Sequence, residues 1–146
     1  SGMGVDEETM YRALIVADLV TIHQKTGIGC LSAYCGAISA GCGCGAGISF
    51  LNGGRYEEIA HTLVNSVAIL SGTICDGAKP SCAAKIAMAV EAGIMGYEMW
   101  KNGSQFHGGD GIVHITSLGD SFFLTCNKIQ YKRYDLMQII LSLNKN

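Results

Sequence analysis

Residues 29–54, "GCLSAYCGAISAGCGCGAGISFLNGG", decide the fold of this chain. The stretch from Thr26 to Gly54 has no Asp, Glu, Lys or Arg, and it is long enough to cross a bilayer. Small residues gain little from lipid contact, but they let backbones approach closely inside a protein. Each Gly lowers helix propensity. We nevertheless expect a helix over 31–51 that is buried on all sides, not a membrane span.

Helical patterns surround this segment. Asp6 is a good N-cap for a first helix that ends near Gly27, and "NGG" at 52–54 is a turn. A third helix is expected over 55–73. A fourth runs from Pro80, at the first helical position, to about Lys101. Its inward face is expected to consist of Ala83, Ile86, Val90, Ile94 and Tyr97.

We predict an all-α antiparallel bundle with an irregular C-terminal tail, in which "SFFLTCNKIQY" (121–131) is strand-like.

Composition narrows the class of protein. The 146 residues are 49% hydrophobic and 15% charged, with a formal net charge of −2 and no cluster of Lys or Arg. We therefore expect no nucleic-acid partner. The chain has seven cysteines, and it begins with an acidic, polar segment that does not resemble a signal peptide. Cysteines in that context indicate a reducing compartment, so we expect a cytoplasmic protein.

Two familiar motifs are absent. The glycines at 41–47 do not fit a phosphate-binding loop, because no Lys-Ser/Thr pair follows and a GxGxxG pattern fails at Ala46 and Ile48. Close helix packing explains them better. The histidines are dispersed, and His23 and His61 are expected to be hydrogen-bonded structural residues.

Cys75 and Cys82 bracket the only proline in the chain. Cys82 is expected in the first turn of the fourth helix, where the helix dipole favours a thiolate. Cys75 is expected at the end of the third helix, facing the same turn. Two such thiols can bind one metal centre, and thiolates are the usual ligands of iron–sulfur clusters. Two ordinary buried cysteines at a tight turn remain the alternative.

Four segments resemble the L-cysteine desulfidase family, which is related to the α-chain of iron–sulfur L-serine dehydratases. They are "LVTIHQKTGIGCLSAYCGAISAGCG" (19–43), "GGRYEEIAHTLVNSVAILSG" (53–72), "SGTICDGAKPSCAAKIA" (71–87) and "EAGIMGYEMWKNG" (91–103). The resemblance covers residues 4–113 and is most specific at 72–87. It implies a [4Fe–4S] cluster held by Cys35, Cys75 and Cys82, with Cys42 as the alternative to Cys35. Asp76 and Lys79 are candidates for supporting the cluster turn, with a helix-cap or surface role as the alternative.

Three ligands leave one iron open to act as a Lewis acid. In the family, the substrate's carboxylate and β-substituent are thought to approach that iron while a base removes the α-proton. Sulfide or water leaves, and the product hydrolyses to pyruvate and ammonia. The resemblance therefore implies β-elimination of L-cysteine or L-serine, with a small amino acid as substrate.

The resemblance also implies that residues 1–113 form the cluster-binding domain, with 114–146 as a divergent tail. Family proteins are longer, and the base is expected in an N-terminal portion that this chain lacks. That portion is an expected partner, and the chain alone is expected to be inactive. The alternatives are a non-catalytic, truncated paralogue that binds a cluster or a partner, and a structural helical domain with packed cysteines. Assembly into a homo-oligomer stays open.

Overall fold

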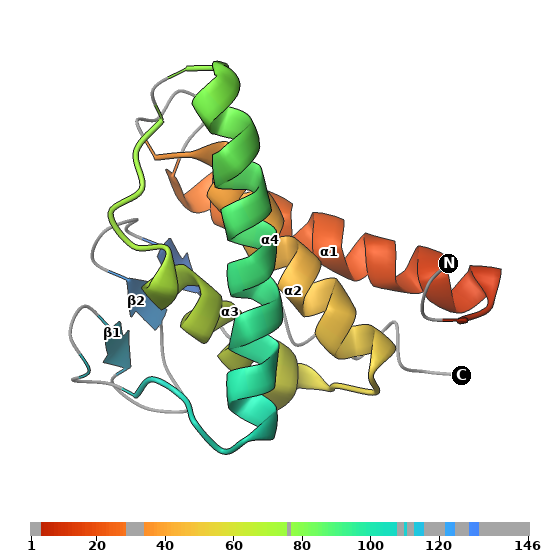
Figure 1. The fold of residues 1–146 in the computed structure, drawn as a ribbon. Helices are drawn as coiled ribbons and strands as arrows, with labels where there is room; N and C mark the ends of the chain where they lie inside the picture. Colours follow the sequence, from red (N-terminus) through yellow and green to blue (C-terminus); the bar gives the residue numbers. More distant parts are fainter. Residues whose placement is uncertain are drawn as a thin grey trace.

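The computed structural model describes residues 4–28, 34–75, 77–107, 110, 113–115, 122–124 and 129–131. These residues form four α-helices: α1 (Glu7–Ile28), α2 (Gly36–Leu51), α3 (Tyr56–Ile69) and α4 (Pro80–Lys101) (Figure 1). The body of the protein is all-α, as predicted. No helix in the described part of the chain has both the length and the apolar character needed to cross a membrane.

α2 is the central helix, because it packs against each of the other three (Figure 1). The glycines of α2 allow its backbone to approach two of these helices, α4 and α1, closely. A Cβ added at Gly45 would lie 2.8 Å from the Cα of Gly93 in α4. One added at Gly43 would lie 2.5 Å from the carbonyl oxygen of Ala17 in α1. The glycine run therefore serves helix packing, as the sequence analysis predicted.

α3 packs against both α2 and α4 and carries the most deeply buried part of the core. Ile59 and Val64 are fully buried there. Asn65 is equally buried, and its side chain links three segments. Its Nδ2 donates to the Gly96 carbonyl at 3.1 Å, and its Oδ1 accepts from the Phe106 N–H at 3.0 Å. This one amide ties the segment after α4 back onto the bundle.

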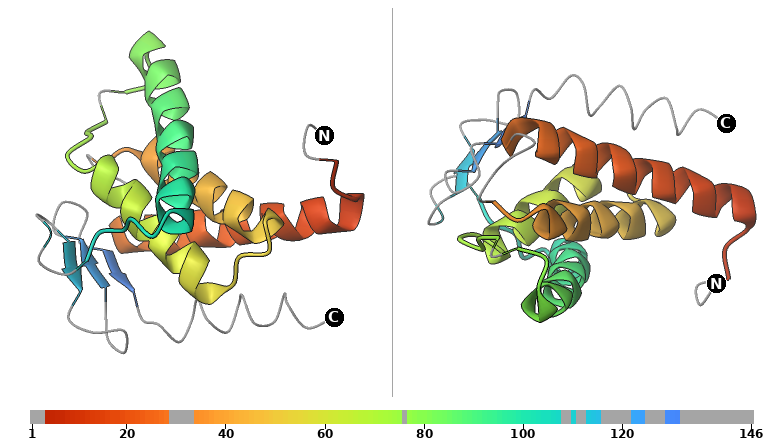
Figure 2. Two further views of the ribbon diagram at one scale, coloured as in Figure 1. Left: turned by 60° about the horizontal axis from the view of Figure 1, so that its bottom comes forward. Right: turned by 90° about the horizontal axis from the view of Figure 1, so that it is seen from above.

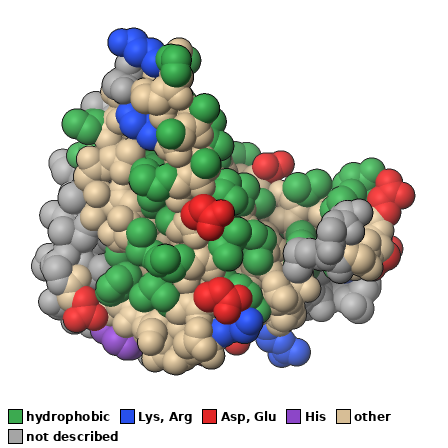
Figure 3. Space-filling model, viewed as in Figure 1, with side chains coloured by type: hydrophobic (Ala, Val, Ile, Leu, Met, Phe, Trp, Pro, Cys, Tyr) green, Lys and Arg blue, Asp and Glu red, His purple; other side chains and the backbone are tan. Residues whose placement is uncertain are grey.

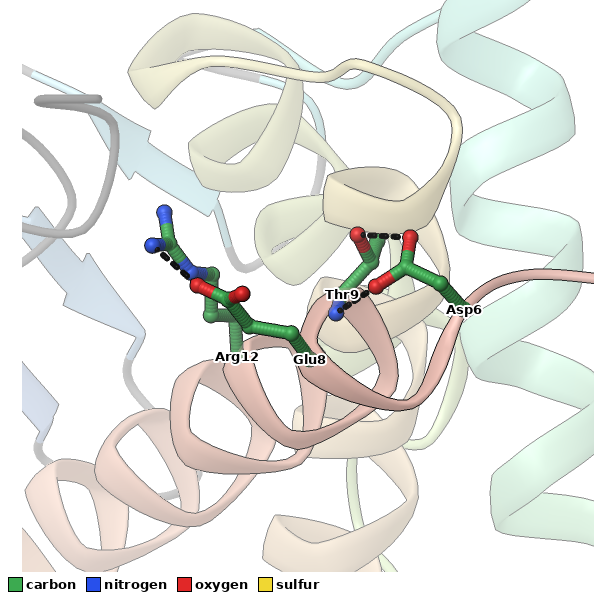
Figure 4. A network of polar contacts seen from close by, with 4 residues as sticks. All are labelled: Asp6, Glu8, Thr9 and Arg12. Carbon is green, nitrogen blue, oxygen red and sulfur yellow. Dashed lines mark hydrogen bonds and ion pairs between the residues drawn. The ribbon is translucent and has the colours of Figure 1, made fainter.

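The N-terminus of α1 is capped as expected (Figure 4). The Thr9 N–H donates to Asp6 Oδ1 at 2.9 Å, and the Thr9 hydroxyl donates to Asp6 Oδ2 at 2.7 Å. These hydrogen bonds lower the pKa of the Asp6 carboxyl below its usual value, because they favour the charged form. Arg12 pairs with Glu8 at 2.7 Å on the next turn.

The predicted helix boundaries differ from the structure mainly at two ends. α2 begins at Gly36 and not at residue 31, because Tyr34 and Cys35 have an extended backbone. α3 ends at Ile69, four residues early, because Leu70 is its C-cap and Gly72 has a φ of 83°. α4 begins at Pro80 and ends at Lys101, as predicted.

The predicted inward face of α4 is wrong in its N-terminal half. Ala83 is exposed and Ile86 is 50% exposed, whereas Tyr97, nearer the C-terminus, is buried. The helix instead packs through small residues, because these allow its backbone to approach α2 and α3 closely. They are Ala89, Ala92, Gly93 and Gly96.

Among the described residues, three short strands follow the helices: β1 (Val113–Ile115), β2 (Phe122–Leu124) and β3 (Ile129–Tyr131). They form an antiparallel sheet in the order β1-β2-β3, beside the C-terminal end of α1 (Figure 2). β2 and β3 confirm the strand-like character predicted for 121–131 where that segment is described, and its other residues lie outside the described part of the chain. The division into a domain at 1–113 and a tail at 114–146 stays a prediction.

Candidate metal centre

An isolated antiparallel β-bridge joins Tyr34, just before α2, to Ile74, in the connection between α3 and α4. Cys35 follows Tyr34 and Cys75 follows Ile74. In a regular antiparallel ladder, two residues that each follow a bridged residue share one face and lie diagonally opposite, with Cα atoms about 7–8 Å apart. The bridge thus brings together two of the three predicted ligands.

The first turns of α4 lie beside this bridge. Lys85 Nζ donates a hydrogen bond to the carbonyl oxygen of Ile74 at 3.0 Å. Cys82 precedes Lys85 by three residues, so the two side chains are neighbours on one side of the helix. Cys82 is half-buried in the first turn of α4, as predicted. The Lys85 contact therefore links the third predicted ligand to the segment that carries Cys75.

Helix ends make this region electropositive. Cys35 is the N-cap of α2 and Lys79 is the N-cap of α4, and neither makes a side-chain capping hydrogen bond. Neither helix has an acidic residue in its first turn. By contrast, α1 is capped by Asp6, and Glu58 accepts from the Arg55 N–H at the start of α3. The two helices that have Cys35 and Cys82 at their N-terminal ends are thus those whose positive dipole ends are not neutralised locally.

Burial separates the cysteines of α2. Cys35 is 4% exposed at the start of the helix, whereas Cys42 lies two turns deeper, about 10 Å along the axis, with no exposed surface. Burial raises the pKa of the Cys42 thiol to about 12, although the neighbouring Gln24 side chain acts in the opposite direction. Cys42 is therefore a protonated core residue. Cys44 is exposed.

The other residues predicted for the site are Cys75, Lys79 and Asp76. Cys75 is exposed and lies six residues after the end of α3, so its predicted place at that helix end is wrong. Lys79 is exposed at the start of α4. Asp76 lies outside the described residues. The sequence analysis missed Lys85 and Tyr34, although the spacing of Lys85 from Cys82 on a helix was a usable signal.

The cysteine thiols are the groups through which these residues could bind a metal ion or a cluster. All five cysteines in the described part of the chain are free thiols. Within that part, no three His, Cys, Asp or Glu side chains are arranged to hold a metal ion. A four-iron cluster spaces its ligands more widely than one ion does. Three thiols on adjoining segments, two of them at helix N-terminal ends, fit such a cluster in chemical type.

A family model described as serine dehydratase alpha chain matches residues 1–142. This chain belongs to the serine dehydratase alpha chain family. The match to this family reaches into the tail at 114–146, for which the sequence analysis found no resemblance.

Several relatives are proteins described only as UPF0597 proteins. One from Desulfitobacterium hafniense is 69% identical over 107 residues, which are 73% of this chain and 25% of the relative. Another, from Treponema denticola, is 53% identical over 75% of this chain and 25% of the relative. One from Fusobacterium nucleatum is 44% identical over 76% of this chain and 26% of the relative. The chain thus spans about a quarter of the length of these curated relatives. No solved structure matches it.

Proposed function

We propose that this chain is the cluster-binding portion of a serine dehydratase-like lyase that eliminates the β-substituent of L-cysteine or L-serine. Cys35, Cys75 and Cys82 are the proposed ligands of a [4Fe–4S] cluster. The observation that carries the proposal is the Tyr34–Ile74 bridge, which pairs the residues preceding two of these cysteines. Membership of the serine dehydratase alpha chain family supports the reaction class.

The three proposed ligands lie near positively polarised or charged groups. Cys35 and Cys82 lie at the N-terminal ends of α2 and α4, where the helix dipoles stabilise anions. Cys75 follows the residue whose carbonyl accepts from the Lys85 ammonium group. When bound, the cluster would supply a Lewis-acidic iron with an open position. The chain's own contribution is to hold three thiolates in an electropositive setting.

The Cys35 assignment is preferred to Cys42 on structural grounds. The Tyr34–Ile74 bridge lies directly beside Cys35, whereas Cys42 is enclosed in the core two turns away. Asp76 and Lys79 remain proposed supports of the cluster turn. The base that removes the α-proton is proposed to come from family sequence outside this chain.

Anaerobic reconstitution tests the cluster. The chain is incubated with ferrous iron and sulfide, and bound iron and acid-labile sulfide are measured per chain. We expect about four irons per chain. Separate Cys35→Ala, Cys75→Ala and Cys82→Ala variants should each lose most of this iron, and the exposed Cys44→Ala variant should keep it. Full iron binding by any of the three variants would remove that residue from the ligand set.

The reaction needs a longer protein for its test. This chain can replace the matched segment of the Desulfitobacterium hafniense relative, to which it is 69% identical. Pyruvate formation from L-serine is then compared with pyruvate and sulfide formation from L-cysteine, with and without cluster reconstitution. A reconstituted chimera that acts on neither amino acid would contradict the proposed reaction but not the cluster site.

A further inference from the structure

α2 and α4 together leave an apolar surface uncovered. On α2, Gly41 and Gly45 face α4, whereas Gly43 and Gly47 face α1. At 100° per residue, Ala40 lies between these two directions, on the side away from α3. Ala40 and Cys44 are exposed there. The central helix is therefore buried on three sides and open on the fourth, so the expectation that it is buried on all sides is wrong on this side.

α4 continues this surface. It contacts α2 through Ala89 and Gly93, and it contacts α3 through Gly96. The side of α4 next to α2 and away from α3 carries Ile86, Val90 and Ile94. Ile86 is 50% exposed, and the other two are half-buried. In Figure 3, hydrophobic side chains gather along α4 and continue toward α1, with an acidic side chain among them. We call this surface the open face; it consists of Ala40, Cys44, Ile86, Val90 and Ile94.

The spacing of these residues is that of a buried helix face. Ile86, Val90 and Ile94 recur at every fourth position, which is the pattern of a helix stripe that faces a core. None of the five residues is charged, and α2 contains no charged residue. Single exposed apolar residues are common, but a contiguous apolar surface from two helices indicates an interaction site.

We infer that the open face docks an apolar helical segment from the part of the family protein that lies outside this chain. The chain covers 25% of its Desulfitobacterium hafniense relative, so three quarters of such a protein is available as the partner. An uncharged face fits an apolar segment that completes a core. The inference rests on the proposed function only in taking the partner from the same family protein.

Cys44 provides the readout, because it is an exposed cysteine of the open face. The isolated chain and the chimera with the Desulfitobacterium hafniense relative are treated with N-ethylmaleimide without metal, and Cys44 labelling is followed by peptide mass mapping. Docking should slow Cys44 labelling in the chimera at least about tenfold relative to the isolated chain. Equal rates would overturn the inference, whatever the cluster result.

Paired variants test the surface itself. In the chimera, Ile86→Asp and, separately, Ala40→Asp should restore fast Cys44 labelling. Met95→Asp is the matched control, because Met95 is 55% exposed on another side of α4 and its variant should stay protected. Circular dichroism of each isolated variant checks folding. A second copy is the competing occupant, and slow Cys44 labelling in an isolated chain that is dimeric by light scattering would favour it over the inference.

Discussion

Gly45 of α2 and Gly93 of α4 meet backbone to backbone, because a Cβ added at Gly45 would lie 2.8 Å from the Gly93 Cα. The contact lies at the crossing of the two helices, on the central helix of the bundle. No flexible side chain stands at this point, so a larger residue could be accommodated only by moving a helix.

Gly45→Ala should therefore destabilise the fold by about 1–3 kcal/mol, despite the better helix propensity of Ala. Urea unfolding followed by circular dichroism measures this change. Gly36→Ala is the matched control, because a Cβ there meets no atom within 4 Å. Its stability should stay within about 0.5 kcal/mol of the parent. Equal effects at the two glycines would contradict the packing of α2 on α4.

Asn65→Ala should destabilise the protein by about 1–3 kcal/mol, because it leaves the Phe106 N–H without its partner and removes the bond to the Gly96 carbonyl. Asn102→Ala removes a similar amide-to-carbonyl bond at the exposed end of α4. That variant should lose no more than about 0.5 kcal/mol. Thermal unfolding of both variants makes the comparison, and a small loss at Asn65 would show that its two bonds are not maintained.

Cys42 should resist alkylation in the folded chain. Its thiol is fully buried, and its pKa is raised to about 12, so little thiolate forms at about pH 8. The exposed Cys44 and Cys75 should react readily under the same conditions. Labelling with N-ethylmaleimide, read by peptide mass mapping, compares them. Rapid labelling of Cys42 would mean that the core around α2 opens easily. Cys42 would then again be a candidate cluster ligand.

His61 should make stability depend on pH. Burial lowers its pKa below the ordinary 6.5, and His107 acts in the same direction. Above pH 6.5 the imidazole is neutral in both states. As the pH falls below 6.5, the unfolded chain binds a proton more readily than the folded one, so stability declines until the folded pKa is passed.

His61→Phe should weaken that decline while keeping an aromatic ring against Trp100, which stacks on His61 with ring centroids 4.8 Å apart. His107→Asn should keep most of it, since burial is the larger cause of the shift. Urea midpoints measured between about pH 5 and pH 7.5 give the slopes. An unchanged slope in His61→Phe would assign the pH dependence to other groups.

The helices could be predicted because their signals are local. Asp6, the turn at 52–54 and Pro80 end or begin helices through their own backbone preferences and hydrogen bonds. The glycine run predicted close packing, since small residues serve little other purpose inside a charge-free helix. The same reasoning failed at the end of α3, where Leu70 and Gly72 stop the helix before the predicted residue 73.

The candidate site was predictable only in its residue types. Helix-end positions indicated Cys75 and Cys82, and the resemblance added Cys35. No local pattern indicated that Tyr34 pairs with Ile74 or that Lys85 reaches the Ile74 carbonyl. These contacts join residues far apart in the chain, so they depend on how the helices pack.

The sequence by itself determined the helical segments and the small-residue surface through which α2 packs, because both depend on residues close together in the chain. Only the tertiary structure decided which helix faces are buried. The stripe of Ile86, Val90 and Ile94 has the spacing of a core face, yet α4 approaches α2 and α3 through Ala89, Gly93 and Gly96. Backbones approach most closely where side chains are smallest. The small residues of α4 therefore form the contact with α2 and α3, and the larger ones lie outside it.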